Sequence, residues 1–385
     1  METAIGAALA DGLGATTASE VGRAGRRADR RWPVASAAAL GLGVVHVLLQ
    51  RPVALTAQPY PDGIEYLTAA RNLALGNGYR VQAPGFPTAP RYPPGFPAAL
   101  ALGARIGHYP GNVEGASLVI SALLLVVAWA AARRIAGDRA ACLTAVLMGV
   151  SPFAAATGRV VMSDTFAAVL TGGAVFALAG PKTLRRSVVV GVLLGYSVLV
   201  RLGNIVFLGP LWFTRRRWQL LLAAAPVLAG LVVFQWVVYH HPTTGGYVIR
   251  QERFAVSSIT AAHPWQDLPW YARDGIRRPF AQPGGQVARL PNLVAYPALL
   301  LGYPWVFAPP LTLVAGVVEL WRRRRSELGR LAAGLVVGNL VLYLPFFAQC
   351  ARYVAPAATV LCIFAGVGLS RLLDRRKAAG GAPVS

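Results

Sequence analysis

Acidic side chains are scarce in this sequence. Its 385 residues include 15 Asp and Glu against 37 Lys and Arg, and only 14% are charged, where a soluble domain carries about 25%. Hydrophobic residues make up 55% of the chain, the mean hydropathy is +0.51, and long apolar runs recur along the whole length. The composition therefore excludes a soluble domain with one anchor and predicts an all-α polytopic membrane protein.

Cysteine is also rare, and Cys142, Cys350 and Cys362 are far apart. Two of them fall in apolar runs, so no disulfide framework is expected. The arginine-rich stretch that ends at Arg31 lacks a small-residue cleavage site, which favours a cytoplasmic tail before a signal-anchor helix. The formal net charge of +22 does not indicate nucleic acid as a partner, because the arginines cluster at the ends of apolar segments, where membrane orientation explains them.

Hydropathy and the placement of arginine predict about ten membrane-spanning segments of about 20 residues or fewer. The predicted segments are residues 33–53, 113–132, 140–158, 164–180, 187–200, 202–214, 218–239, 293–320 (broken), 328–347 and 354–371.

The basic residues give these segments an orientation. If the N-terminus is inside and the segments alternate, the inside stretches collect most of the basic residues in tight clusters. The clusters are 23–31; Arg133, Arg134 and Arg139; Lys182, Arg185 and Arg186; 215–217; 322–325 with Arg330; and 371–377. Cytoplasmic loops are enriched in Lys and Arg, so both termini are expected to be cytoplasmic, as tails of residues 1–32 and 372–385 around a core of residues 33–371.

Two segments allow more than one interpretation. Residues 187–214 could form one helix or a short hairpin. A single helix would place Arg201 within the span, at a cost of about 2.5–3.5 kcal/mol, and would move the arginines at 215–217 outside, so a hairpin with Arg201 near its outer turn is favoured. Residues 290–321 contain Pro297, Pro304, Pro309 and Pro310, which should break the segment into a surface helix and a span.

The outer stretches carry the chemically interesting residues. They are two loops, at about 50–112 and 240–292, and short turns that contain Asp164, Arg201 and Arg352. The positive-inside rule disfavours arginine in short outer loops, so its presence there needs another reason. Arginine's planar fork matches phosphate oxygens, and an anionic lipid substrate would explain it. Contact with ordinary phospholipid headgroups is the alternative.

Asp62 and Glu65 begin an expected surface helix, with Ile64, Leu67 and Ala70 on one apolar face. As N-cap and third residue, the two acids could form an acidic capping box. A carboxylate held at the membrane surface could equally take the proton from an attacking hydroxyl group.

Three further motifs have structural alternatives of the same kind. Arg91 and Tyr92 precede a Pro-Pro pair, whose extended geometry can aim both side chains at a shared site; Tyr92 could instead anchor the membrane interface. Asp164 could be a helix cap, and Arg352 a headgroup anchor.

The order of the motifs along the chain resembles that of a known protein superfamily. The chain reads DGIEY and then GNGY, followed by RYPPGFP, GRVVMSDTF, LVRLGN and ARYVAP. This series resembles the GT-C superfamily of membrane glycosyltransferases, in the branch with the protein O-mannosyltransferases and the lipid A aminoarabinose transferases, over residues 33–371. The resemblance implies a GT-C fold with surface helices in the first extracytoplasmic loop.

The resemblance also implies roles for single residues. Asp62 would be the catalytic base and Asp164 the second outer carboxylate, while Glu65 would replace the second acid of the Asp-Glu pair that many protein O-mannosyltransferases carry. Arg91, with Tyr92 beside it, falls near the basic residue that faces lipid phosphate in the aminoarabinose transferases. From the arginine argument above, Arg91, Arg201 and Arg352 are expected to converge on that phosphate.

The function expected from these residues is that of a bacterial cell-envelope enzyme, mannosyltransferase-like and inverting. It would move a sugar from a polyprenyl-phosphate donor to a hydroxyl group of an extracytoplasmic glycan, lipid or protein, at the outer face of the plasma (inner) membrane. Trp265, Trp270 and Tyr271 in the second loop are available for stacking on sugar or for interface anchoring. The alternative is a transporter or flippase of lipid-linked sugars, which the surface position of the carboxylates and the lack of an internal repeat disfavour.

A nucleotide-sugar site and a metal site are not expected. No glycine-rich loop opens a helix, and the DxD motif of soluble metal-dependent glycosyltransferases does not occur. His240, His241, His263 and Asp267 match no zinc spacing. No cofactor is therefore predicted, with a divalent cation left open.

Overall fold

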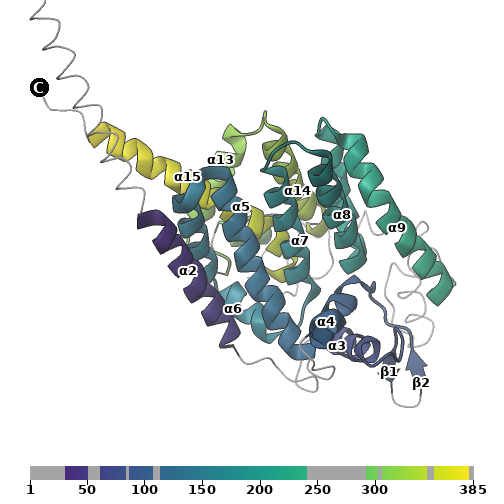
Figure 1. Ribbon diagram of the computed structural model, residues 1–385. Coiled ribbons are helices and arrows are strands. Elements are labelled where there is room, and N and C mark those ends of the chain that lie inside the picture. Colours follow the sequence, from purple (N-terminus) through teal and green to yellow (C-terminus); the bar gives the residue numbers. More distant parts are fainter. Residues whose placement is uncertain are drawn as a thin grey trace, which may run out of the picture.

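Helices make up most of the chain in this computed structural model, which describes residues 31–50, 61–83, 86–106, 113–240, 292–301, 306–344 and 351–380 (Figure 1). The first half contains α2 (Arg31–Leu48), α3 (Pro61–Ala74), β1 (Val81–Ala83), β2 (Phe86–Thr88), α4 (Gly95–Ile106), α5 (Val113–Gly149), α6 (Pro152–Arg159) and α7 (Ser163–Leu178). The second half contains α8 (Leu184–Val200), η2 (Leu202–Phe213), α9 (Arg217–Tyr239), α12 (Asn292–Leu300), α13 (Thr312–Arg322), α14 (Glu327–Tyr343), η3 (Ala351–Val354) and α15 (Ala355–Gly380).

The prediction of a helical, multi-pass membrane protein is confirmed. Every predicted membrane segment contains a described helix. By length and composition, four described helices could cross a membrane, namely Arg31–Leu48, Val113–Gly149, Arg217–Tyr239 and Ala351–Arg375. The longest, α5, is two helices joined at Ala136 and Gly137, where Gly137 has a φ of 82° that glycine adopts without strain. This break falls between the predicted segments 113–132 and 140–158.

Residues 187–214 form the favoured hairpin. α8 ends before Arg201, whose backbone is extended (φ −150°, ψ 123°), and η2 follows. Gly191 of α8 lies against Leu220 of α9, and Gly195 lies against Ala224. α8 and α9 therefore run in the same direction, and η2 must return between them.

The proline-rich segment breaks as predicted, although not at every proline. α12 and α13 are separate helices, and Pro309 and Pro310 lie between them, but Pro297 lies inside α12. The structure also contains an antiparallel pairing of β1 and β2, with Val81 opposite Thr88, which the prediction of an all-α chain did not include.

Small residues allow the helices to pack closely. α15 is the most buried of the four long apolar helices, and it lies among α5, α7, α13 and α14 (Figure 1). A Cβ atom added at Gly316 of α13 would lie 2.4 Å from the carbonyl oxygen of Leu361 on α15. On the other side of the bundle, the Trp129 indole N–H of α5 donates to Ser36 of α2 at 2.6 Å. Such small-residue contacts are typical of helix packing in membranes.

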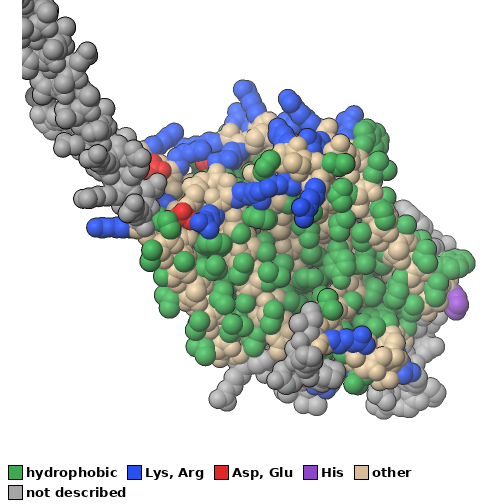
Figure 2. Space-filling view, viewed as in Figure 1, with side chains coloured by type: hydrophobic (Ala, Val, Ile, Leu, Met, Phe, Trp, Pro, Cys, Tyr) green, Lys and Arg blue, Asp and Glu red, His purple; other side chains and the backbone are tan. Residues whose placement is uncertain are grey.

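The described basic clusters gather at one end of the bundle, which we call the arginine-rich end. Arg139 of α5 pairs with Asp374 of α15. Arg216 at the start of α9 donates to the carbonyl oxygen of Lys182 before α8 at 2.6 Å. Figure 2 shows Lys and Arg side chains concentrated at the top of the view, above a predominantly hydrophobic band. The described clusters that were predicted to share one side of the membrane therefore share one end of the fold, and the cluster at 23–31 lies almost entirely outside the described residues.

Replacing Gly191 with alanine should lower the melting temperature of the purified protein. The new Cβ atom would lie 2.2 Å from the carbonyl oxygen of Leu220, and overpacking of this kind costs about 1–3 kcal/mol. Gly230 on α9 is the matched control, because a Cβ atom there meets nothing within 4 Å. Equal melting temperatures for the two alanine variants would contradict the close contact between α8 and α9.

Candidate functional site

The segment that carries Asp62 lies at the end of the bundle opposite the arginine-rich end. α3 and α4 pack together there as surface helices (Figure 1). α3 buries Tyr66, Leu67 and Ala70, whereas Ile64, which was expected on the same face, is exposed. The Arg105 side chain of α4 donates to the last carbonyl groups of α3 at 3.0 Å and so satisfies acceptors that a helix end leaves free.

The Arg91-Tyr92 turn is fixed from several sides. One carboxylate oxygen of Glu65 accepts the backbone N–H groups of Arg91 and Tyr92. The Tyr79 hydroxyl donates to the carbonyl oxygen of Tyr92 at 2.6 Å, and the Tyr239 hydroxyl donates to that of Pro90 at 2.7 Å. These bonds join the turn to α3 and α9, so the turn holds the Arg91 and Tyr92 side chains over Asp62.

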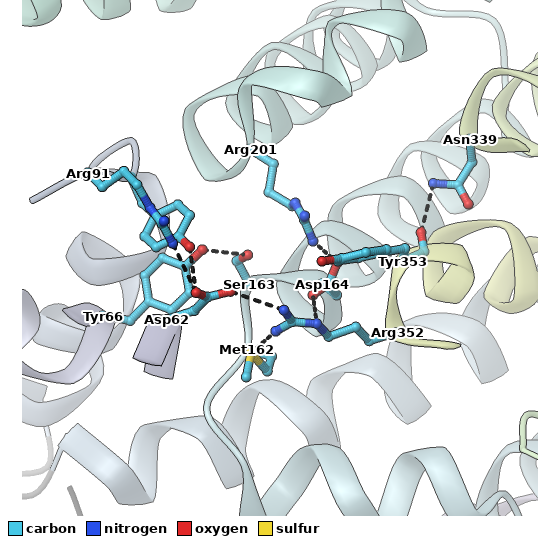
Figure 3. Close-up of polar contacts among 11 residues, drawn as sticks. Asp62, Tyr66, Arg91, Met162, Ser163, Asp164, Arg201, Asn339, Arg352 and Tyr353 are labelled. Atoms are coloured by element: carbon cyan, nitrogen blue, oxygen red, sulfur yellow. Dashed lines mark hydrogen bonds and ion pairs between the residues drawn. The ribbon is translucent and has the colours of Figure 1, made fainter. Parts of the chain in front are cut away.

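Asp62 is bonded to side chains from two other segments (Figure 3). Its Oδ1 atom accepts from Arg91 Nη2 at 3.0 Å and from the Tyr92 hydroxyl at 2.6 Å. Its Oδ2 atom accepts from Arg352 Nη2 at 3.0 Å. Because α3 begins at Pro61, Asp62 lies inside the first turn, and its described bonds run to other segments instead of along the helix.

Asp164, at the start of α7, forms the second carboxylate of the cluster. Its side chain is only 3% exposed and pairs with Arg201. The residue before α7 is Met162, which makes no side-chain capping bond, so the capping alternative does not describe Asp164. Arg352 Nε lies 3.8 Å from Asp164 Oδ2. The guanidinium of Arg352 therefore stands between the two aspartates (Figure 3).

Aromatic rings line the arginines. Tyr343 and Tyr353 stack with centroids 4.8 Å apart, and the Arg201 guanidinium carbon lies 5.5 and 5.1 Å from their centroids. On the opposite side of the cluster, the Tyr66 hydroxyl and the Ser163 hydroxyl are 3.0 Å apart. The sequence did not mark Tyr66 or Tyr343 as site residues. Tyr66 stands directly after Glu65 in the quoted motif, and this position is the one signal that could have identified it.

The arrangement has an excess of positive charge, which suits an anion. Three arginines face two aspartates, and the side chains of Arg91, Arg201 and Arg352 are 24%, 20% and 14% exposed. Arg186 and the other basic clusters lie at the opposite end, so these guanidiniums form a separate group. Asp62 is 23% exposed and can meet a bound molecule, whereas Asp164 lies deeper.

The structure brings together the predicted residues Asp62, Glu65, Arg91, Tyr92, Asp164, Arg201 and Arg352. Trp265, Trp270 and Tyr271 lie outside the described residues, as do His263 and Asp267. Within the described ranges, no three His, Cys, Asp or Glu side chains are grouped as metal ligands.

Glu65 is placed to position the Arg91-Tyr92 turn. Replacing it with alanine should lower activity, because two partly buried backbone N–H groups lose their acceptor, at a cost of up to about 1–3 kcal/mol. Glu65→Gln keeps an acceptor oxygen and should retain most activity. A Glu65→Gln protein as inactive as Glu65→Ala would show that the negative charge is required, and would return Glu65 to the role of an acid or base.

The fold is similar to that of solved membrane-protein structures, although no protein-family model and no curated protein matches the sequence. ArnT from Cupriavidus metallidurans bound to undecaprenyl phosphate superposes with a TM-score of 0.58 at 19% identity, over 89% of this chain and 60% of that one. The archaeal oligosaccharyltransferase AglB from Archaeoglobus fulgidus, in complex with an inhibitory peptide and a dolichol phosphate, superposes with a TM-score of 0.52 at 13% identity, over 91% of this chain and 52% of that one.

These similarities establish the GT-C fold that the motif order predicted. The chain spans about half to three fifths of the length of the two matched chains.

Proposed function

We propose that the protein is a glycosyltransferase that moves a sugar from a polyprenyl-phosphate donor to a hydroxyl group of an extracytoplasmic acceptor. The observation that supports it best is the meeting of Asp62, Arg91, Asp164, Arg201 and Arg352 at one end of an apolar bundle. A lipid phosphate lies at that depth in a membrane, and arginine is suited to bind it through paired hydrogen bonds. Two matched structures, ArnT and AglB, hold an undecaprenyl or a dolichol phosphate.

The ion pairs of Asp62 supply a way to couple donor binding to catalysis. While Arg91 and Arg352 are paired with Asp62, the carboxylate is occupied as an acceptor. A donor phosphate would compete for the same guanidiniums. As they turn to the phosphate, Asp62 would become free to accept a proton, so the base is released when the donor is in place.

The reaction would then be a single displacement with inversion. Asp62 takes the proton of the acceptor hydroxyl, the hydroxyl oxygen forms a bond to the anomeric carbon, and the bond from that carbon to the phosphate oxygen breaks on the opposite face. The phosphate leaves with the electron pair, and Arg91, Arg201 and Arg352 stabilise its charge. Asp164 would orient hydroxyl groups of the sugar or acceptor. The proposal assigns this charge stabilisation to the arginines without a cofactor; a divalent cation is the alternative, and chelator sensitivity of turnover would indicate it.

A transporter of lipid-linked sugars is the second candidate. Transporters place ionisable residues near the middle of the membrane. The described carboxylates of this chain lie instead at or near the ends of helices, such as Asp62 and Asp164 at one end and Asp374 at the other. This distribution favours the enzyme.

The proposed orientation places the arginine-rich end in the cytoplasm and the site on the outer side of the plasma membrane. It predicts that an impermeant maleimide labels Arg159→Cys in intact cells, and labels Arg185→Cys only after permeabilisation. Both arginines are exposed, so a maleimide could reach either position. They lie at opposite ends of the fold, so only the side of the membrane should decide which one is labelled. The reverse labelling pattern would contradict the orientation.

Transfer itself is tested with purified protein in liposomes. Polyprenyl-phosphate-linked mannose and polyprenyl-phosphate-linked aminoarabinose serve as donors, and lipid and glycoprotein profiles of cells with and without the gene identify the acceptor. Release of polyprenyl phosphate together with a glycosylated product would support the enzyme. Movement of the intact donor across the bilayer without bond cleavage would support the transporter instead.

A further inference from the structure

A second charged site lies at the arginine-rich end, far from the one above. It is a small, open recess where α7 ends and where α8, α9 and α14 begin. Its lining includes Lys182, Arg186, Arg216 and Glu327. We call it the basic recess.

Positive charge is concentrated in the basic recess. Gly180 at its edge has Arg186 Nη1 and Arg134 Nη2 within 1.0 and 2.5 Å of the position that a Cβ atom would take. Two guanidinium groups therefore converge over one glycine, and like charges this close repel each other. The described bond of the Glu327 carboxylate goes to the backbone N–H of Arg215, at 3.2 Å. An anion between the guanidiniums would relieve the repulsion.

The basic recess contains an unsatisfied hydrogen-bond donor. Arg186 Nη1 is buried, and within the described part of the chain it has no hydrogen-bond partner. A buried donor without a partner costs about 1–3 kcal/mol, and more when the group is charged. Nη1 of Arg186 is thus a charged donor that a phosphate oxygen would satisfy.

The surroundings of the basic recess are apolar and exposed. Leu184 and Val188 on α8, close in the helix to the lining residues Arg186 and Ser187, are 61% and 42% exposed. They lie on the first two turns of α8, where acyl chains would run along the bundle. A molecule that contacts both features must combine an anionic head with a hydrocarbon tail, which a free phosphate ion does not.

We propose that the basic recess binds the phosphate headgroup of an anionic membrane lipid. Arg134 and Arg186 hold the phosphate oxygens, Lys182 and Arg216 surround them, and the acyl chains lie along α8. Basic pockets between membrane helices bind acidic headgroups in this manner. The site is independent of the proposed transferase activity, since it lies at the other end of the fold.

The test is a thermal-shift titration of the full-length protein in neutral detergent. Phosphatidylglycerol should raise the melting temperature at concentrations where phosphatidylcholine with the same acyl chains, and inorganic phosphate, do not. Replacing Arg134 and Arg186 together with glutamine should weaken the apparent affinity for phosphatidylglycerol by more than about tenfold, because at least one charged hydrogen bond is lost. Native mass spectrometry of the same samples should show less retained phosphatidylglycerol.

The control is the double variant Arg185→Gln with Arg322→Gln, which removes the same charge at the same end of the fold; neither residue lines the recess, and neither is among the nearest neighbours of Gly180 as Arg134 is. It should bind phosphatidylglycerol as the unmodified protein does. An equal loss of affinity in both double variants would overturn the proposal, since net charge alone would explain the binding. Equal stabilisation by inorganic phosphate would identify a free-anion site and reject the lipid. If the Arg134 and Arg186 variant does not fold, the single variant Arg186→Gln is measured by the same criteria.

Discussion

Replacing Asp62 with asparagine is expected to give a folded protein that binds donor and has lost nearly all turnover. A general base contributes about 10²–10⁴-fold to a reaction rate, and an amide cannot take a proton near neutral pH. The single carbonyl oxygen of asparagine can still accept from the Tyr92 hydroxyl and Arg91, which bond Asp62 Oδ1 at 2.6 and 3.0 Å, while its amide group replaces the oxygen that Arg352 meets. The loss should therefore appear in kcat more than in the melting temperature.

Donor affinity gives a second, more specific expectation for the same variant. In the resting protein the Asp62 carboxylate competes with a phosphate for Arg91 and Arg352. Asparagine carries no charge and competes less, so Asp62→Asn should bind the polyprenyl-phosphate donor as tightly as the unmodified protein, or more tightly. Asp374→Asn at the arginine-rich end is the control for loss of one acidic charge, and it should change neither quantity.

The possible results for Asp62→Asn distinguish a catalytic base from a residue with only a structural role. If Asp62 served only to start α3, Asp62→Asn would keep near-normal turnover, because asparagine caps helices about as well as aspartate. That result would contradict the assignment of Asp62 as the general base, and Glu65 or Asp164 would then be tested for that role. Low turnover with weak donor binding would instead indicate that the Asp62 charge organises the arginines before the donor arrives.

Local patterns in the sequence predicted much of the fold. Lys182 and the arginines at 215–217 were both predicted to face the cytoplasm, so the chain between them must cross the membrane an even number of times. This argument predicted the hairpin that turns at Arg201. The same charge pattern predicted the common end at which Arg139 meets Asp374. Motif order, through the resemblance, led to the GT-C fold and to the residues that the structure gathers around Asp62.

The sequence predicted that Asp62 and the three arginines share one site, but not which side chains pair. Asp62 and Arg352 are 290 positions apart, and no periodicity specifies which outer turn meets which. The stack of Tyr343 on Tyr353 depends on how α14 approaches η3, which apolar patterning alone leaves open.

The ion pairs of Glu319 were likewise not predictable from the sequence. Glu319, fully buried on α13, accepts from Arg323 at 2.6 Å and from Arg371 of α15 at 2.9 Å. In the sequence both arginines belong to clusters that membrane orientation already explains. Their common partner appears only once α13 and α15 pack together.

Replacing Arg352 with alanine should reduce kcat by about 10²–10³-fold, the usual cost of removing one donor that stabilises transition-state charge. Arg352 is the one described side chain that reaches both aspartates, at 3.0 Å from Asp62 Oδ2 and 3.8 Å from Asp164 Oδ2. Without it, the leaving phosphate loses a positive partner and the two carboxylates lose the cation between them. The KM for donor should rise more than the KM for acceptor.

Lysine at the same position distinguishes a site residue from a membrane anchor. An anchor to phospholipid headgroups needs only a positive charge, so Arg352→Lys would then be fully active. A site residue needs the planar fork, because a single ammonium group cannot address Asp62, Asp164 and a phosphate together. Arg352→Lys should therefore recover only part of the lost kcat.

The exposed Arg159 near the same end is the control, and Arg159→Ala should leave kcat and both KM values unchanged. Full activity of Arg352→Lys, or equal losses in Arg159→Ala and Arg352→Ala, would remove Arg352 from the donor site.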